Sequence, residues 1–183
     1  SKFKEKPSSN EAFSNLINAG LYIIEPEVME LVPEGQKYDF SKQLFPDVLE
    51  RGWPMYAKTV NGIWFDVGNP FELHKAQMAL IKKRDGLPFP MPKGEVLPDG
   101  SFISESASVS GHISHSVILA GASVNGAAVN SVVMANSRIN GVSESSIVGE
   151  NSIIDSRIQN CVIGDDLHII IDIENEALRK LGD

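Results

Sequence analysis

Three short segments in the first half of the chain carry residue types that can bind a ligand. Near the start, Lys6 precedes a proline and can hold an anionic group, and Glu5 beside it can accept hydrogen bonds from hydroxyl groups. Asn18-Ala19-Gly20 opens an apolar run, and its small residues let backbone and amide groups approach a ligand closely. Asp66 ends another apolar run just before a helix start, where a carboxylate can bind a hard cation such as Mg²⁺ together with phosphate groups.

Each of these segments also has an ordinary structural interpretation. Residues 3–7 can be a solvated terminus, and residues 18–20 can be a turn into a strand. Asp66 can hydrogen-bond its own turn, although Asn69 already fits the N-cap of the following helix. The residue types alone therefore leave both interpretations open at all three places.

The sequence lacks the patterns of several other chemistries. It has neither G-x-G-x-x-G nor G-x-x-x-x-G-K to wrap nucleotide phosphates, and no Cys/His spacing typical of a zinc site. The single cysteine, Cys161, excludes a disulfide framework within the chain. His112 and His115 can in principle serve as general bases in acyl transfer, but no acidic residue stands at an obvious range. We interpret both as exposed surface histidines.

The charge balance narrows the class of partner. Among 183 residues, 24 acidic side chains outnumber 16 basic ones, which gives a net charge of −8. Nucleic acid and anionic membranes need basic side chains to neutralise phosphates, so we expect neither as a partner. The chain has no apolar run of about 18 residues and no charged-then-apolar leader. A cytoplasmic location is the expectation.

The elements that would position these residues follow a mixed α/β pattern. Residues 18–24 are typical of a buried strand, and Asn61-Gly62 between apolar runs at 55–60 and 63–67 predicts a β-hairpin. Three helices are expected: Pro26 to Leu31, a helix capped by Ser41 and stopped by Gly52, and a helix that begins at Asn69-Pro70 and ends at the basic residues 82–84.

The second half contains an internal repeat of 15 residues. A serine or cysteine followed by two apolar residues recurs at this spacing, beginning at Ser101, Ser116, Ser131, Ser146 and Cys161. A second phase runs through Val109, Val124, Ile139 and Ile154, and a weaker third through Ile113, Ala128, Ser143 and Ile158. Three inward aliphatics per repeat predict three short strands per coil, which form a parallel β-solenoid of triangular section. Its narrow interior explains why Phe102 is the only Phe, Trp or Tyr after residue 99.

The domain division follows from this contrast. Residues 1–99 hold all ten prolines and both tryptophans, so the two halves do not share one kind of core. We predict an α/β portion at 1–84, a linker at 85–100 that is rich in proline and glycine, and a solenoid at 101–166. Residues 167–183 are predicted to form a strand and a short helix, residues 174–181, that cap the last coil.

The motifs, taken in order, resemble a known family. They are F-x-E-K-P, N-A-G-L-Y-I, P-E-G-x-x-Y-D-F-S-K-x-L-F-P and W-F-D-V-G-N-P, followed by a hexapeptide-type solenoid. The chain is similar in this order to the C-terminal part of sugar-nucleotide pyrophosphorylases, in particular the mannose-1-phosphate guanylyltransferase and glucose-1-phosphate nucleotidyltransferase group. The resemblance covers essentially residues 2–165.

The resemblance implies a fold, a reaction and a set of roles. The fold would be part of a Rossmann-like nucleotidyltransferase domain followed by a left-handed β-helix. A sugar 1-phosphate would attack the α-phosphorus of a nucleoside triphosphate, with Mg²⁺ as cofactor and pyrophosphate as the leaving group. Glu5 would bind sugar hydroxyls, Lys6 the sugar phosphate, and Asn18 and Gly20 would line the sugar pocket. Asp66 would be one of two aspartates that hold Mg²⁺.

The chain also departs from the family. The Gly-rich G-x-x-x-R-L-x-P-L-T loop and the first metal-binding aspartate, which precede F-x-E-K-P in the family, do not occur in it. We therefore assign no catalytic residue here and expect the 183-residue chain alone to be inactive. The flat faces of a solenoid predict a homo-oligomer. Two alternatives remain: a non-catalytic regulatory or scaffolding subunit that senses a nucleotide sugar, and a hexapeptide acyltransferase, against which residues 1–85 argue.

Overall fold

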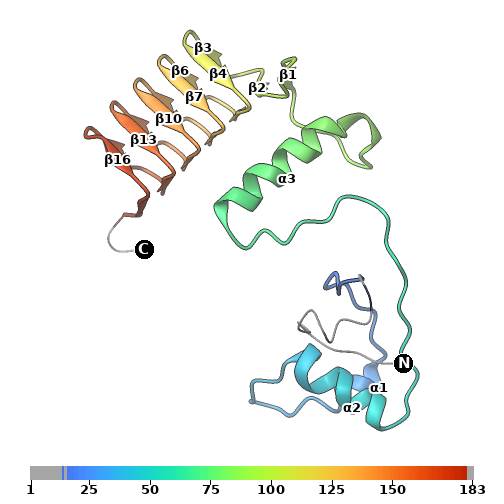
Figure 1. Cartoon of the computed structure of the whole chain (residues 1–183). Helices are drawn as coiled ribbons and strands as arrows, with labels where there is room; N and C mark the ends of the chain where they lie inside the picture. The colour runs from blue at the N-terminus through green and yellow to red at the C-terminus, as the bar shows by residue number, and fades with distance from the viewer. Residues whose placement is uncertain (1–13, 15, 181–183) are drawn as a thin grey trace. The chain divides into compact units, whose positions relative to one another are not determined.

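The chain consists of two compact units, Ser1–Trp64 and Phe65–Asp183. Each unit is described by itself, in a computed structural model that describes residue 14 and residues 16–180. Figure 1 shows the elements of each unit along the chain. The predicted division at residues 84 and 100 remains a prediction, whereas contacts place residues 65–99 in the same unit as the repeat.

The first unit is built around short helices. Helix α1 spans Pro26–Met29, and helix α2 spans Phe45–Glu50 directly after a single π-helical turn, Phe40–Leu44. Asp39 caps this turn, because its Oδ1 accepts hydrogen bonds from the backbone N–H groups of Ser41 (2.9 Å) and Lys42 (3.0 Å). The prediction of Ser41 as the cap was therefore wrong, because the helical segment begins two residues earlier. The N–H groups of Gln43 and Leu44, which a cap at Ser41 would serve, donate to the backbone carbonyl of Asp39 instead. Leu44, Phe45 and Val48 form the buried side of this element.

The strands predicted in the first half are not formed. The described residues at 18–24, 55–60 and 63–67 have no ladder partner, so the hairpin expected at Asn61-Gly62 was wrong. The apolar residues of these runs are exposed instead, with Leu21 at 78% and Val60 at 68% of full exposure. A strand is stable only when a neighbour pairs its backbone groups and covers its apolar face, and the described part of this unit supplies no such neighbour.

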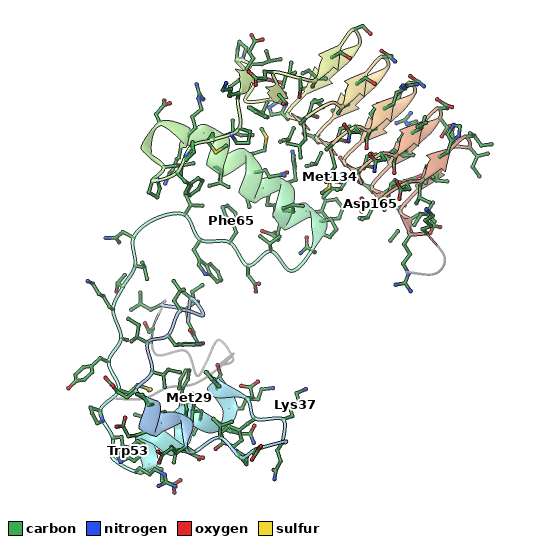
Figure 2. The ribbon with its side chains drawn as sticks, turned by 180° about the vertical axis from the view of Figure 1, so that it is seen from behind. Met29, Lys37, Trp53, Phe65, Met134 and Asp165 are labelled. Atoms are coloured by element: carbon green, nitrogen blue, oxygen red, sulfur yellow. The ribbon has the colours of Figure 1, made fainter. Side chains whose placement is uncertain are left out.

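Helix α3, Pro70–Lys82, forms as predicted after Asn69, and it lies in the second unit. Asn69 Oδ1 accepts a hydrogen bond from the backbone N–H of Glu72 (3.0 Å), and Pro70 occupies the first helical position. A 3₁₀ turn, Arg84–Gly86, follows. Ile81 is buried among four residues on the outer face of one solenoid sheet: Phe102, Val117, Val132 and Ile147. Met134, labelled in Figure 2, adds to this cluster.

The repeat forms a parallel β-solenoid, as predicted (Figure 1). One sheet contains β2 Phe102–Ser104, β5 Val117–Ile118, β8 Val132–Val133, β11 Ile147–Val148, β14 Val162–Ile163 and β17 Ala177–Leu178, with β1 Gly94–Val96 added antiparallel to β2. A second contains β4 His112–Ser114, β7 Ala127–Val129, β10 Val142–Glu144, β13 Arg157–Gln159 and β16 Ile173–Glu174. The third contains β3 Ser108–Val109, β6 Ser123–Val124, β9 Arg138–Ile139, β12 Ile153–Ile154 and β15 His168–Ile169.

The inward positions of the coils follow the predicted phases. Val124, Ile139 and Ile154 are fully buried one above another, and Val124 pairs with Ile139 in the ladder. Ser116, Ser131 and Ser146 are also buried, and each satisfies its hydroxyl within the stack. Ser131 Oγ accepts a hydrogen bond from the N–H of Ser146 (3.2 Å) and donates to the carbonyl oxygens of Val129 (2.8 Å) and Ser143 (3.1 Å). The serines at the head of each repeat are therefore core residues of the solenoid corner.

The solenoid continues beyond residue 166. Strands β15, β16 and β17 pair in parallel with the preceding coil, and Ile173 stands in register with Ile158 and Leu178 with Ile163. The helix expected at 174–181 is absent from its described part, residues 174–180. The prediction failed because the apolar residues at 177 and 178 fit a helical stripe as well as the 15-residue phase. No helix in the described part of the chain has the length and apolarity needed to cross a membrane.

Candidate functional site

The Asn18-Ala19-Gly20 segment forms an exposed turn in the first unit. Asn18 Oδ1 accepts a hydrogen bond from the backbone N–H of Gly20 at 2.9 Å, which closes the turn. Gly20 has a φ of +75°, a conformation that side-chain-bearing residues rarely adopt, and among the described residues no atom beyond its chain neighbours lies within 4 Å of where its Cβ would be. The turn is therefore tightly bent and open on the side of Gly20, which suits close approach of a ligand.

A second hydrogen bond anchors this turn to the helical part of the unit. Asn18 Nδ2 donates to the hydroxyl of Tyr22 at 2.6 Å. The ring of Tyr22 packs edge-on against Phe45 with centroids 4.9 Å apart, and lies 6.1 Å from Phe40. The conformation of Asn18 is thus tied to the aromatic cluster at the start of α2.

The turn is also joined to the W-F-D-V-G-N-P segment. The indole N–H of Trp64 donates to the carbonyl oxygen of Ala19 at 3.1 Å, across 45 residues of chain. Trp64 is not among the site residues predicted from the sequence. The sequence signals that point to it are its position two residues before Asp66 and its place in an aromatic set confined almost entirely to the first half.

Asp66 belongs to the second unit, at its start. Its backbone carbonyl accepts a hydrogen bond from the N–H of Gly68 (2.9 Å), and the residue is exposed. Within residues 16–180, its carboxylate has no hydrogen-bond or ion-pair partner, so the side chain does not serve the turn. The same residues contain no group of three or more His, Cys, Asp or Glu side chains that could hold a metal ion. Asp66 thus offers a single free carboxylate.

The structure does not bring all the predicted site residues together. Glu5 and Lys6 lie outside the described residues. Asn18 and Gly20 share one turn, whereas Asp66 lies in the other compact unit.

The two solenoid histidines have the exposed positions expected of them. His115 adopts a left-handed φ of 47°, and its backbone N–H donates to Asp99 Oδ2 at 2.9 Å. Asp99 also accepts from the backbone N–H of Ser101, and these two backbone bonds hold the pKa of its carboxyl at about 2. His115 Nδ1 is hydrogen-bonded to the hydroxyl of Ser114 at 2.9 Å. The carboxylate therefore holds the corner backbone and does not orient the imidazole for catalysis.

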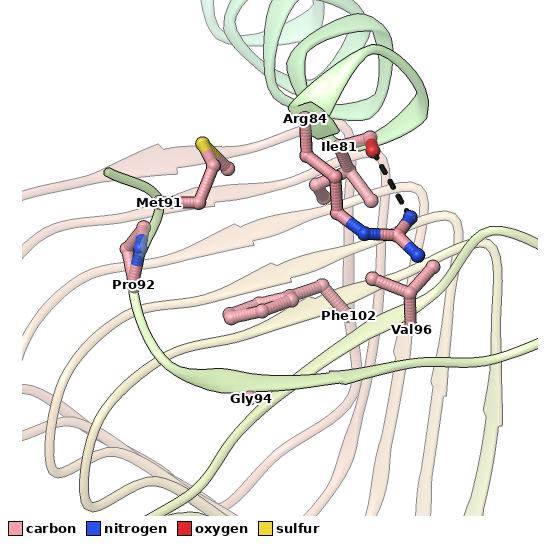
Figure 3. A pocket seen from close by; sticks show the side chains of 7 residues that line it. All are labelled: Ile81, Arg84, Met91, Pro92, Gly94, Val96 and Phe102. Carbon is pink, nitrogen blue, oxygen red and sulfur yellow. Dashed lines mark hydrogen bonds between the residues drawn. The ribbon is translucent and has the colours of Figure 1, made fainter. Parts of the chain in front are cut away.

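A small hollow lies where the end of α3 meets β1 and the first coil (Figure 3). Phe102 and Val96 supply apolar walls, and Arg84 lies across it, with Nη1 3.4 Å from the carbonyl oxygen of Ile81. None of the site residues predicted from the sequence lines this hollow.

The fold defines a class of protein: a segment with short helices and an exposed turn, joined to a parallel β-solenoid. Comparison with known proteins names the segment, because residues 1–83 match the family model described as nucleotidyl transferase. The resemblance to sugar-nucleotide pyrophosphorylases is thereby confirmed, and the relatives are named as sugar-phosphate nucleotidyltransferases.

Three relatives illustrate the similarity. A UTP–glucose-1-phosphate uridylyltransferase of Synechocystis is 47% identical over 66 residues, 36% of this chain and 17% of that protein. A glucose-1-phosphate adenylyltransferase of Clostridioides difficile is 31% identical over 143 residues, 66% of this chain and 36% of the relative. A mannose-1-phosphate guanyltransferase of Eremothecium gossypii is 34% identical over 113 residues, 60% of this chain and 30% of the relative. The matches thus span between about a sixth and about a third of these relatives' own lengths.

Proposed function

We propose that this chain is the C-terminal portion of an NDP-sugar pyrophosphorylase. The parent protein would transfer a nucleotidyl group from a nucleoside triphosphate to a sugar 1-phosphate, either mannose 1-phosphate with GTP or glucose 1-phosphate. The match of residues 1–83 to the nucleotidyl transferase family carries this proposal. The named activities of the three relatives support it, because all act on a sugar 1-phosphate.

In this proposal the chain contributes the sugar side of the reaction. Glu5 accepts hydrogen bonds from sugar hydroxyls, Lys6 pairs with the sugar phosphate, and Asn18 and Gly20 line the sugar pocket. A phosphate oxygen of the sugar 1-phosphate attacks the α-phosphorus of the triphosphate, and the bond from this phosphorus to the bridging oxygen breaks as pyrophosphate leaves. Holding the sugar 1-phosphate in line with that bond is what these residues supply to catalysis.

Asp66 would hold part of the metal site. Mg²⁺ is usually bound by one or two carboxylates together with substrate phosphates and water, so a single free carboxylate fits a shared site. When bound, Mg²⁺ neutralises charge on the phosphate oxygens. The exposure of Asp66 and its lack of a partner in the described residues support this role.

The solenoid would serve assembly. Its repeated flat faces favour contacts between copies, so we propose a homo-oligomer of the parent protein.

The test is a product assay. The full-length product of the gene is incubated with Mg²⁺, each of the common nucleoside triphosphates and a panel of sugar 1-phosphates, and pyrophosphate release and NDP-sugar formation are measured. We expect turnover with at least one pair, and a loss of at least about 100-fold in Asp66→Asn because one metal ligand is lost. The 183-residue chain alone should show no turnover. Full-length protein that binds a nucleotide sugar and forms none would overturn the proposal in favour of a regulatory subunit.

A further inference from the structure

The hydrogen bond between Trp64 and Ala19 links two segments that are far apart in sequence. The indole N–H of Trp64 lies 3.1 Å from the carbonyl oxygen of Ala19, and both residues belong to the first compact unit. Within residues 16–180, the other hydrogen bonds of this turn are local: Asn18 with Gly20, and Asn18 with Tyr22. Among these residues, Trp64 therefore makes the one hydrogen bond that joins the turn directly to a distant part of the chain.

Apolar packing does not explain why Trp64 is there. Its side chain is 48% exposed, so much of its large ring still faces water. An indole N–H is a donor only and needs an acceptor when its surroundings are partly dry, and the Ala19 carbonyl is that acceptor. The other tryptophan contrasts with it: Trp53 lies with its ring 5.8 Å from the guanidinium of Arg51, and within the described residues its indole N–H has no acceptor.

A hydrogen bond to the Ala19 carbonyl restricts the conformation of the whole turn. Ala19 stands between Asn18 and Gly20. Both polar atoms of the Asn18 side-chain amide are hydrogen-bonded, and the backbone of Gly20 is in the left-handed region. Fixing the carbonyl oxygen fixes the peptide plane that joins Ala19 to Gly20. The direction of the Gly20 N–H and of the open side of the turn is then fixed as well.

We propose that Trp64 is a positioning residue for the sugar 1-phosphate, acting through the Ala19 carbonyl on the turn of Asn18 and Gly20. This inference rests on the proposed function, because it takes the turn to be part of the sugar site.

The experiment compares two tryptophan substitutions in the full chain. Trp64→Phe keeps an aromatic ring and removes the N–H donor, and Trp53→Phe is the matched control on the only other tryptophan. Binding of glucose 1-phosphate and mannose 1-phosphate is measured by calorimetry. Because one hydrogen bond is removed, we expect Trp64→Phe to weaken binding about five- to tenfold, whereas Trp53→Phe changes it less than about twofold. The thermal midpoint of both variants is recorded alongside.

A second measurement, the KM values of the full-length protein, separates a positioning role from a purely structural one. Trp64→Phe should raise the KM for the sugar 1-phosphate by the same factor and leave the KM for the nucleoside triphosphate unchanged. If the wild-type chain binds a sugar 1-phosphate and Trp64→Phe binds it equally well, the positioning role is overturned and the proposed function stands. If the wild-type chain binds neither sugar 1-phosphate, the sugar site itself is overturned, and the positioning role falls with it.

Discussion

In helix α3, the Nε2 atom of His74 lies 2.9 Å from the carbonyl oxygen of His115 at a corner of the solenoid. A carbonyl oxygen only accepts, so His74 is the donor and carries its proton on Nε2. Two turns further along the helix, Ile81 packs on Phe102 and Val117 of the solenoid. The helix is therefore held at both ends, although it lies inside residues 1–83 that match the nucleotidyl transferase family. The last part of the family-matched segment, residues 65–83, thus shares one compact unit with the solenoid.

The first prediction concerns the docking of α3. Ile81 is only 3% exposed, so Ile81→Ala should lower the opening free energy of α3 by about 2–5 kcal/mol, because it removes buried methyl groups and leaves a cavity. His74→Ala should lower it by about 1 kcal/mol, the usual value of one hydrogen bond. Amide hydrogen exchange of residues 74–82 measures both. Lys83→Ala is the control, because Lys83 is exposed and should change the value by less than about 0.5 kcal/mol. An Ile81→Ala effect as small as that of the control would show that α3 is not docked.

The second prediction concerns acid stability. The pKa of Asp99 falls from 3.8 to about 2 because the backbone N–H groups of Ser101 and His115 donate to its carboxylate. Because this pKa is lower in the folded state than in the unfolded state, the ionised carboxylate stabilises the fold at pH values above the unfolded-state pKa. This stability is lost as the pH falls from about 4 to about 2. Asp99→Asn should therefore lower the thermal midpoint at pH 7 and show a smaller difference from wild type at pH 2.

Thermal melts at pH 7, 4, 3 and 2 test this. Asp85→Asn is the matched control, because the Asp85 side chain is 95% exposed and should give melts like wild type at every pH. A difference between Asp99→Asn and wild type that stays constant down to pH 2 would contradict the assigned role of Asp99.

The third prediction concerns the serine ladder. Ser131→Ala removes a hydroxyl that serves the N–H of Ser146 and two carbonyl oxygens, and it leaves buried polar groups without partners. We expect a loss of about 1–3 kcal/mol in the free energy of unfolding. Ser131→Cys should cost less, because Cys161 stands at the equivalent position and its Sγ lies 3.1 Å from the carbonyl oxygen of Gln159. Ser108→Ala, at an exposed strand position, is the control in the same urea titrations. Equal stability of the alanine and cysteine variants at 131 would argue against a hydrogen-bonding role.

The solenoid was predictable because each coil repeats the same physical requirement at a fixed spacing. Val124, Ile139 and Ile154 must point inward together, and this leaves a period in the sequence. The strands of the first half were not predictable in the same way. Residues 18–24 have strand composition, but a strand also needs a partner, and the described residues supply none.

The candidate site likewise contains residues that a sequence pattern can indicate and one that it cannot. Asn18, Gly20 and Asp66 were predicted as site residues because their residue types suggest chemistry close to element ends. Trp64 was missed because its hydrogen bond ends on a backbone carbonyl 45 residues away. Every non-terminal residue offers such a carbonyl, so no sequence pattern identifies the acceptor.

The fourth prediction concerns the spacing of the coils at the corner that precedes the second sheet. A Cβ on Gly126 would lie 1.8 Å from the carbonyl oxygen of Gly141 in the next coil, and one on Gly111 would lie 1.9 Å from that of Gly126. Where Ser156 replaces the glycine, the hydrogen bonding changes: the N–H of Arg157 donates to Asp172 Oδ1 at 2.8 Å, and Ser156 Oγ donates to the carbonyl of Ile171. A side chain at this corner therefore goes with a rearranged neighbouring coil.

Gly126→Ala should for this reason cost at least about 3 kcal/mol in the free energy of unfolding, because the coils above and below prevent such a rearrangement. Gly86→Ala is the matched control, since among the described residues no atom outside its own turn lies within 4 Å of its Cβ position, and it should change stability by less than about 1 kcal/mol. Urea titrations followed by circular dichroism compare the two. If Gly126→Ala is as stable as Gly86→Ala, the coils are not stacked closely enough at this corner to exclude a methyl group.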